Sequence, residues 1–215
     1  MRFLTEEEAR TLLDALALRS LDVHDEALLS LFSGLRAREI HALTWTNVDF
    51  ANGALFIRDP KSKRNRHVHI TGEIRAMLER RYKGQTKTEF IFPADGGKLR
   101  EWVPDTLARI IDELGFNDTG EFTEDAEGNP VPVKIQDRRQ RVVFHSLRHT
   151  FASWLVMRGV PLYTVAQLMG HSTIVMTQRY SHLAPDSMRH AALKLQGVLD
   201  KQPAKVTPFL QVTGQ

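Results

Sequence analysis

Apolar residues recur every three or four positions along most of this chain, which is the spacing of amphipathic helices. Leu12, Leu13 and Leu16 form the first such stripe. The sequence Thr5 to Glu8 in front of it has the pattern of a capping box, which marks a helix start. The same spacing predicts further helices over about 25–33, 37–45, 72–82, 104–114, 146–158, 161–169, 173–182 and 185–199.

Two short stretches break the helical spacing. Residues 54–58 and 67–70 have the composition and alternation of strands, and Asn52-Gly53 ahead of the first favours a tight turn. A basic loop, residues 60–66, lies between the two predicted strands. The predicted fold class is therefore α+β, mainly α, with a small antiparallel β-sheet inside a helical domain.

The segment 115–141 shows neither periodicity, and we predict an irregular, solvated connection there. It is acidic at first and basic afterwards, with Glu127 to Pro130 as a turn or the tip of a hairpin. Its acidic residues lack the spacing of a calcium-binding loop.

Composition narrows the class of protein further. The 215 residues are 42% hydrophobic, which is enough for the core of one good-sized domain. There is no cysteine, so disulfides and thiolate zinc sites are excluded. A formal net charge of +3 permits nucleic-acid binding without requiring it. No membrane span and no signal peptide is visible, so we expect a cytoplasmic protein, or a fragment of one, without a membrane partner.

Tyr180 is the first candidate for chemistry. A phenol is a weak nucleophile at neutral pH, and it becomes reactive when cations surround it and a base takes its proton. Arg179 adjoins Tyr180 in the sequence, and His171 and His182 lie close by. A structural tyrosine, half-buried on a helix, is the competing interpretation, and Tyr180 alone does not decide between them.

His145 and Arg148 lie three residues apart at the start of a predicted helix, so they share one face. The apolar stripe of that helix points elsewhere, and both side chains are expected to be free to face a ligand such as a phosphate. His145 and His149 also have the spacing of helical zinc ligands. The glutamate of the His-Glu-x-x-His pattern is missing, however, and Arg148 between two ligands would repel a dication.

Arg36 forms a third candidate site. It follows Gly34, which is expected to end a helix, and Glu39 lies three residues further on. Glu39 is therefore placed to hold the Arg36 guanidinium in one orientation, as a preorganised site requires. An ordinary surface salt bridge is the competing interpretation.

Together and in this order, these segments resemble the active-site motifs of the tyrosine recombinases, the phage integrase family. Gly34 to Asp49 resembles the first motif, an arginine followed by an acid three residues later. His145 to Ala152 resembles the His-x-x-Arg motif, here with a trailing His-Thr. Leu168 to His171, with Tyr180, resembles the last motif, a histidine after glycine and a tyrosine nine residues on.

The predicted strand–loop–strand segment resembles the β-hairpin that carries the catalytic lysine of this family. Lys61 is the better match because Arg66 follows it five residues later, and Lys63 is the alternative. His69 stands where proline is usual and Asn47 where aspartate is frequent, and neither is a catalytic position of the family.

The resemblance implies site-specific DNA recombination, either integration or excision. Strands would be cleaved and rejoined through a 3′-phosphotyrosyl intermediate, without a metal or any other cofactor. Lys61 would protonate the leaving 5′-oxygen, and His145 would assist proton movement at Tyr180 or bind a phosphate oxygen. The implied catalytic residues are Arg36, Lys61, His145, Arg148, His171 and the nucleophile Tyr180, supported by Glu39. The basic residues expected to hold the DNA backbone are Lys63, Arg64, Arg66, Arg138, Arg139 and Arg141.

The resemblance covers residues 1 to about 200 and leaves 201–215 as a tail. Members of the family generally carry an N-terminal helical domain that clamps DNA. This chain starts with the helix that opens the catalytic domain, so we expect an isolated catalytic domain. The expected partners are double-stranded DNA, three further copies of the chain in a homotetramer on paired DNA sites, and accessory DNA-bending proteins. The isolated domain itself is expected to be a monomer.

Two other functions remain open from the sequence. One is a DNA-binding module that keeps this fold but does not cut, and the other is DNA relaxation of the type IB topoisomerase kind. The complete set of motif residues argues against the first, and the motif around His171 and Tyr180 is closer to the integrases than to the topoisomerases.

Overall fold

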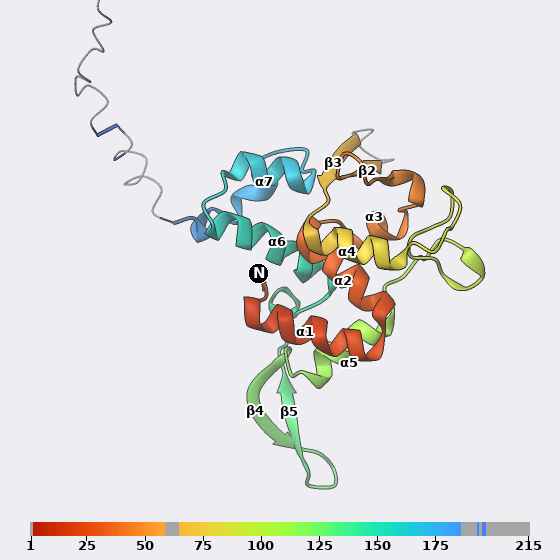
Figure 1. Ribbon diagram of the computed structural model, residues 1–215. Helices are drawn as coiled ribbons and strands as arrows, with labels where there is room; N and C mark the ends of the chain where they lie inside the picture. Colours follow the sequence, from red (N-terminus) through yellow and green to blue (C-terminus); the bar gives the residue numbers. More distant parts are fainter. Residues whose placement is uncertain (1, 59–64, 186–192, 194, 197–215) are drawn as a thin grey trace, which may run out of the picture.

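The computed structural model describes residues 2–58, 65–185, 193, 195 and 196, and within these the chain is mainly helical with two small antiparallel sheets (Figure 1). The α-helices are α1 (Glu6–Arg19), α2 (Leu21–Ser33), α3 (Ala37–His41), α4 (Gly72–Arg81), α5 (Asp105–Glu113), α6 (Phe144–Met157), α7 (Leu162–Met169) and α8 (Val175–Gln178). The strands are β1 (Val48–Asp49), β2 (Ala54–Arg58), β3 (Asn65–His69), β4 (Asp118–Glu124) and β5 (Pro130–Lys134). Short 3-10 helices are η1 (Trp45–Asn47), η2 (Asp95–Gly97), η3 (Arg138–Gln140) and η4 (Ser181–Leu183).

The first two helices begin and end at the signals that their sequences carry. The Thr5 hydroxyl accepts a hydrogen bond from the backbone N–H of Glu8, whose carboxylate accepts one from the N–H of Thr5. α2 begins at Leu21, four residues earlier than predicted, because the polar residues of its first turn hide the apolar spacing. Gly34 ends α2 in the left-handed conformation, with φ 68°.

Three hydrophobic clusters hold the body together, and α2 and α6 each take part in two of them. α2 contributes Leu29 to the cluster under the three-stranded sheet and Leu31 to the cluster shared with α1 and α5. α6 contributes Leu147 to that second cluster and Val156 to a third, which packs against α7. Each such side chain stabilises the fold by about 1.5–3 kcal/mol when fully buried. α2 and α6 therefore fix the three-stranded sheet, α1, α5 and α7 relative to one another.

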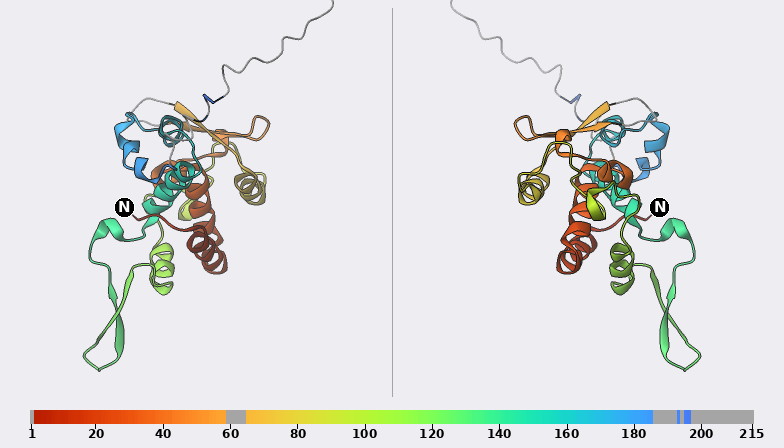
Figure 2. Two further views of the ribbon diagram at one scale, coloured as in Figure 1. Left: turned by 90° about the vertical axis from the view of Figure 1, so that its left-hand side faces the viewer. Right: turned by 90° about the vertical axis from the view of Figure 1, so that its right-hand side faces the viewer.

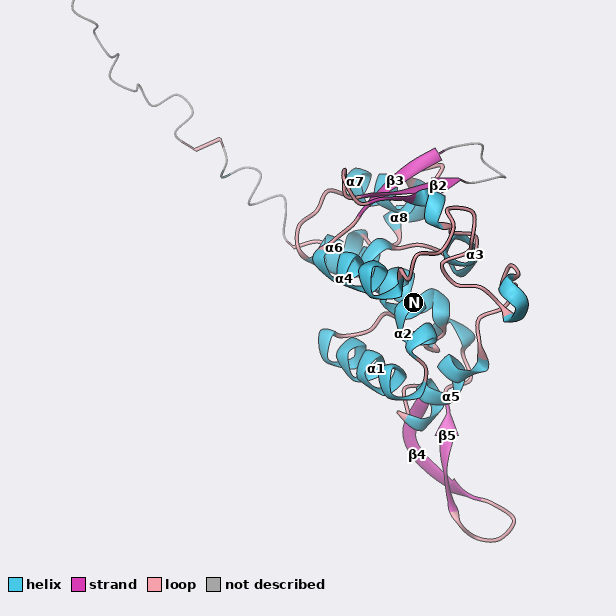
Figure 3. Cartoon of the chain, turned by 45° about the vertical axis from the view of Figure 1, so that its right-hand side comes forward, coloured by secondary structure: helices cyan, strands magenta, loops and turns pink. Residues whose placement is uncertain are grey.

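The predicted small sheet is present and closes one end of the body. β2 pairs antiparallel with β3, with Leu55 opposite Val68, and both side chains point into the core. The sheet and the β4–β5 hairpin lie at opposite ends of the molecule (Figure 3). The basic loop between β2 and β3, with Lys61, Lys63 and Arg64, lies outside the described residues. The same holds for most of the helix predicted over 185–199.

The prediction of an irregular segment over 115–141 is wrong for its central part. β4 and β5 pair as an antiparallel hairpin that projects away from the helical body, with its tip at the predicted turn (Figure 2). Almost every residue of β4 is exposed. β4 is polar apart from Phe122, and β5 alternates two valines with two prolines, which argue against a strand, so neither segment has the usual strand pattern.

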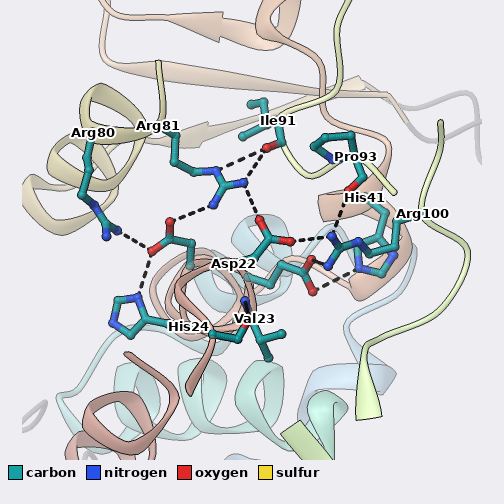
Figure 4. Close-up of polar contacts among 12 residues, drawn as sticks. Asp22, Val23, His24, His41, Arg80, Arg81, Ile91, Pro93 and Arg100 are labelled. Carbon is teal, nitrogen blue, oxygen red and sulfur yellow. Dashed lines mark hydrogen bonds and ion pairs between the residues drawn. The ribbon is translucent and has the colours of Figure 1, made fainter. Parts of the chain in front are cut away.

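α2 also carries a group of carboxylates that sequence reasoning missed (Figure 4). Asp25 and Glu26 are fully buried, and each is paired, Asp25 with Arg81 at 3.0 Å and Glu26 with Arg100 at 2.6 Å. Both arginines also donate to backbone carbonyl oxygens of the segment that follows α4. The pairs therefore fasten α4 and that segment to α2. We call this group the α2 ion network, and its members are Asp22, Asp25, Glu26, Arg80, Arg81 and Arg100.

None of the described helices is both long enough and apolar enough to cross a lipid bilayer.

Candidate active site

Arg148 lies at the centre of the candidate active site and is only 1% exposed. Its guanidinium donates to the carbonyl oxygen of Gly34 and, at 2.6 Å, to that of Met169. These two carbonyls lie at the ends of α2 and α7, so one side chain ties together the segments that carry Arg36 and His171. The prediction that Arg148 is free to face a ligand is wrong, because α6 is packed between α2 and α7.

The carboxylate of Glu39 lies among three arginine side chains, those of Arg36, Arg66 and Arg148. It accepts a hydrogen bond from the Arg36 guanidinium at 3.1 Å and another from the Arg36 backbone N–H at 2.8 Å, so the predicted pairing is present. Arg66 of β3 binds both oxygens of the same carboxylate, at 2.8 and 2.9 Å. A nitrogen of Arg148 lies 3.9 Å from it. Glu39 therefore holds three guanidinium groups from three different elements side by side.

Arg66 differs from its predicted role. We expected it to hold the DNA backbone, but its guanidinium is engaged in the two-point pairing with Glu39 and its side chain is 12% exposed. In this position Arg66 holds the carboxylate, and through it Arg36, rather than reaching outward.

Gly170 brings the last motif against this group. It ends α7 with φ 67°, a conformation that glycine adopts without strain. A Cβ atom at this position would come within 2.7 Å of a guanidinium nitrogen of Arg66. A glycine is therefore required both by the turn and by the close approach, and it places His171 beside Arg66.

Tyr180 is buried, with 3% exposure, in the cluster that packs α6 against α7. Its hydroxyl lies 2.6 Å from Nδ1 of His149. We predicted that His145 assists proton movement at Tyr180, but His149 lies between them. The His145 ring packs edge-to-face against the His149 ring, with 4.5 Å between the ring centroids. The histidine in contact with the phenol is therefore His149, which the sequence had suggested only as a zinc ligand.

The interaction of His149 with Tyr180 joins α6 to the segment after α8. The spacing of apolar residues does not predict a contact between these two elements. The signal in the sequence that could have indicated His149 is the His-Thr that follows the His-x-x-Arg motif. In the part of the chain that the structure describes, no group of three or more histidine, aspartate and glutamate side chains is placed to hold a metal ion.

The three arginines before α6 do not join this group. Arg139 is paired with Asp137 at 2.8 Å and is 85% exposed, and the Nε of Arg141 donates to the carbonyl oxygen of Ile135. Arg138 lies with Arg139 in η3. Contact of these residues with a DNA backbone stays a prediction.

With this geometry in place, the comparisons with known proteins are informative. The model of the phage integrase family matches residues 2–187. The chain belongs to the phage integrase family.

The sequence is similar to those of several named recombinases and integrases. The chain is 30% identical to the tyrosine recombinase XerA of Saccharolobus solfataricus, over 77% of this chain and 47% of that protein. It is 30% identical to the tyrosine recombinase XerC of Oceanobacillus iheyensis, over 89% of this chain and 60% of that protein. It is 27% identical to the integrase of Salmonella phage P22, over 92% of this chain and 48% of that protein. The chain thus spans about half the length of the relatives that it matches.

Solved structures agree with this family assignment. The catalytic domain of bacteriophage HP1 integrase superposes with a TM-score of 0.64 at 25% identity, covering 94% of this chain and 99% of that one. The integrase of the Tn1549 transposon, in complex with a circular intermediate DNA, gives a TM-score of 0.68 at 20% identity, over 90% of this chain and 65% of that one. The predicted fold, a mainly helical recombinase catalytic domain with a small antiparallel sheet, is confirmed.

Two histidines of the candidate site in this integrase-family domain, His149 and His171, are held neutral. Burial, together with the nearby charges of Arg148 and Arg36, lowers the pKa of His171 to about 4. Burial and the neighbouring His145 lower the pKa of His149 to about 3. At neutral pH neither imidazole carries a charge, so the positive charge of the site resides on its arginines.

The arginines outnumber the acid that they surround. Burial by itself would raise the pKa of Glu39, but its bonds to Arg66 hold that pKa below the ordinary value, and the carboxylate is ionised. Burial and the neighbouring Arg36 lower the pKa of Arg148 to about 9, which leaves it charged at neutral pH. Three guanidinium groups around one carboxylate make the site a net cation, which suits a phosphate group.

Proposed function

We propose that this chain is the catalytic domain of a site-specific recombinase that cleaves and rejoins double-stranded DNA through a 3′-phosphotyrosyl intermediate. Tyr180 is the nucleophile. The observation that carries the proposal is the Arg148 bridge between the carbonyls of Gly34 and Met169, because it assembles three distant motifs into one cationic site. Family membership supports it.

The cationic groups have distinct tasks in this reaction. Phosphoryl transfer needs positive charge around the non-bridging oxygens of the phosphate, and preorganised guanidinium groups supply it. The Arg36 side chain is 36% exposed and can contact the phosphate directly. The Arg148 side chain is only 2% exposed, so its charge would act on the phosphate from below the surface. It also fixes the ends of α2 and α7 through the carbonyls of Gly34 and Met169. His171 adds a neutral donor.

The chemical step exchanges one phosphodiester for another. The Tyr180 oxygen forms a bond to phosphorus, the bond from phosphorus to the 5′-oxygen breaks, and the phenolic proton passes to a base, the role predicted for His145. Lys61, the predicted general acid, would supply the proton that the 5′-oxygen takes up. No bond energy is lost to water, so the reverse attack by a 5′-hydroxyl rejoins a strand.

Tyr180 must leave its present position before it can react. At 3% exposure its oxygen is out of reach of a DNA phosphate, and burial raises the pKa of its phenol. The buried phenol is therefore both inaccessible and less acidic than a free one. The arrangement with His149 corresponds to a resting state, from which the Tyr180 side chain is released when DNA is engaged.

Further features of the proposal follow the family. The partners would be double-stranded DNA and, on paired sites, a homotetramer of the whole protein, helped by accessory DNA-bending proteins. Arg138, Arg139 and Arg141 would contact the DNA backbone. The protein would act in the cytoplasm, where bacterial and phage DNA lies.

A covalent-trapping experiment tests the proposal. Because the target sequence is unknown, the substrate is a pool of random-sequence duplexes with one 5′-bridging phosphorothiolate per strand. The sulfur departs without needing a proton and does not attack again, so every cleavage leaves a protein–DNA adduct. Protein at about 10–100 µM covers the affinity range of non-specific DNA binding.

The wild type is expected to form an adduct that survives denaturing gel electrophoresis, and Tyr180→Phe is expected to form none while binding DNA equally well. Binding of DNA without any adduct from the wild type would favour the non-cutting DNA-binding module. An adduct from Tyr180→Phe would show that another residue is the nucleophile. Relaxation of supercoiled plasmid without strand exchange would favour the topoisomerase alternative.

A further inference from the structure

His171 is braced by a residue that the family motifs leave out. Its Nδ1 lies 2.7 Å from the hydroxyl oxygen of Thr177. Thr177 belongs to α8, is completely buried, and lies three residues before Tyr180. His171 itself is half-buried and directly follows Gly170, which fixes where its backbone lies. The contact therefore restrains the orientation of the His171 ring.

The surroundings of Thr177 favour the threonine as the donor in this hydrogen bond. Buried hydroxyls generally find an acceptor for their proton. Two other threonines on helices, Thr11 and Thr150, donate to the carbonyl oxygen four residues earlier. For Thr177, the only acceptor recorded within the described residues is Nδ1 of His171. Nδ1 therefore offers its lone pair, and the single proton of the neutral ring lies on Nε2.

We propose that Thr177 is a positioning residue of this active site, whose hydroxyl holds His171 as the tautomer with its proton on Nε2. The imidazole then presents an N–H donor, and not a lone pair, to a phosphate oxygen. That the phosphate belongs to DNA rests on the function proposed above, whereas the tautomer is a property of the chain alone.

The choice of tautomer matters because His171 is neutral. A protonated imidazole has a donor on both nitrogens and would need no help, but burial and the charges of Arg148 and Arg36 lower the pKa of His171 to about 4. At neutral pH the ring has one N–H, and the partner of the other nitrogen decides where it lies. With the proton on Nδ1, the Nε2 lone pair would repel the phosphate that the arginines attract.

Thr177 also connects this brace to the nucleophile. The backbone N–H of Tyr180 donates to the carbonyl oxygen of Thr177 at 3.0 Å. The donor orientation of His171 and the position of Tyr180 are therefore set by the same helical turn.

Three substitutions test the proposal in the whole chain. Thr177→Val removes the hydroxyl and keeps the shape of the side chain, and Thr177→Ser restores the hydroxyl. Thr11→Val is the control, because it removes a helical threonine hydroxyl of α1 that, in the described part of the chain, bonds only to the carbonyl oxygen of Glu7 and does not touch His171. The ring nitrogens of His171 are followed by NMR at neutral pH without DNA, and the single-turnover rate of adduct formation is measured on the phosphorothiolate pool.

We expect the proton on Nε2 in the wild type, in Thr177→Ser and in Thr11→Val, and a substantial share on Nδ1 in Thr177→Val. The rate should fall about 100-fold in Thr177→Val, the usual loss for one transition-state donor, and return to within about threefold in Thr177→Ser.

A wild-type ring with its proton on Nδ1 would overturn the inference, and this measurement needs no variant to fold. So would a Thr177→Val protein that keeps both the Nε2 tautomer and the wild-type rate. If the wild type forms no adduct at all, the proposed function fails, and the tautomer measurement still decides the role of Thr177.

Discussion

The molecule contains two clusters of buried arginine and carboxylate groups, and they differ in their balance of charge. In the α2 ion network, three carboxylates face three guanidinium groups (Figure 4). In the candidate active site, the guanidinium groups of Arg36, Arg66 and Arg148 surround the single carboxylate of Glu39. The first cluster is neutral, and the second has a positive excess.

This difference separates a structural cluster from a binding one. The carboxylates of the α2 ion network are saturated by arginine, and spare N–H groups of Arg81 and Arg100 go to backbone carbonyls. Such a cluster has nothing left for a ligand and serves to fasten α4 to α2. In the candidate active site one carboxylate faces three guanidinium groups, and the excess positive charge would attract an anion. Counting charges within a cluster is therefore more informative than counting arginines.

The largest expected effect is the loss of cleavage on Arg148→Lys. A lysine cannot donate to the carbonyls of both Gly34 and Met169 in the planar geometry of a guanidinium, so the three motifs lose their common anchor. The single-turnover rate of adduct formation should fall about 1,000-fold or more. The control is Arg158→Lys in the exposed pair with Glu6, and its rate should stay within about twofold of wild type. A modest loss in Arg148→Lys would mean that the bridge is dispensable.

The next effect concerns the α2 ion network and should appear in stability rather than in rate. Arg100→Met leaves the completely buried Glu26 without its arginine, so the free energy of unfolding should fall by about 3–5 kcal/mol in urea titrations. The exposed pair of Arg19 with Glu113 is the matched control, and Arg19→Met should cost less than about 1 kcal/mol.

If the network is purely structural, the Arg100→Met protein that remains folded should cleave at the wild-type rate. A normal stability with a reduced rate would reverse the assignment of the two clusters.

The last effect is a difference in the response of the two clusters to acid. The pKa values of His149 and His171 are lowered to about 3 and about 4 from 6.5, so the unfolded chain takes up protons that the folded one does not. Stability therefore falls as pH drops from about 6.5 towards 4, with a slope of at most about 1.4 kcal/mol per pH unit for each histidine. In the α2 ion network, the pKa of Asp25 is lowered from 3.8 in spite of its burial, so its contribution is lost only below that pH.

The urea midpoint measured between pH 7 and pH 4 checks this comparison, with His149→Gln as the variant. Glutamine keeps a polar group near Tyr180 and has no proton to gain, so the slope of the midpoint against pH should become shallower. A slope that is unchanged in His149→Gln would show that the acid sensitivity originates elsewhere.

Two features were not predicted from the sequence: the β4–β5 hairpin and the buried carboxylates of α2. The polar composition of β4 and the prolines of β5 hide the hairpin from a search for apolar alternation. The early turns of α2 are polar because Asp22, Asp25 and Glu26 meet arginines from distant segments. Helices with a regular apolar stripe, such as α4 and α5, were predicted to within one or two residues. In α2 the distant partner of a polar residue, and not the residue itself, determines its place.

For the active site, the sequence by itself determined which residues belong together: the arginine with an acid three positions later, the His-x-x-Arg motif, and the histidine with a tyrosine nine positions later. Each of these is a set of residue types at a fixed short spacing along the chain, and such spacing can be read directly from the sequence. Only the tertiary structure decided that Arg148 is a buried bridge, that Arg66 holds Glu39, that His149 meets Tyr180, and that Thr177 braces His171. All but the last join segments that are far apart in the chain, and the last depends on how a short loop turns back. Burial and long-range packing set such contacts, so they appear only when the chain is folded.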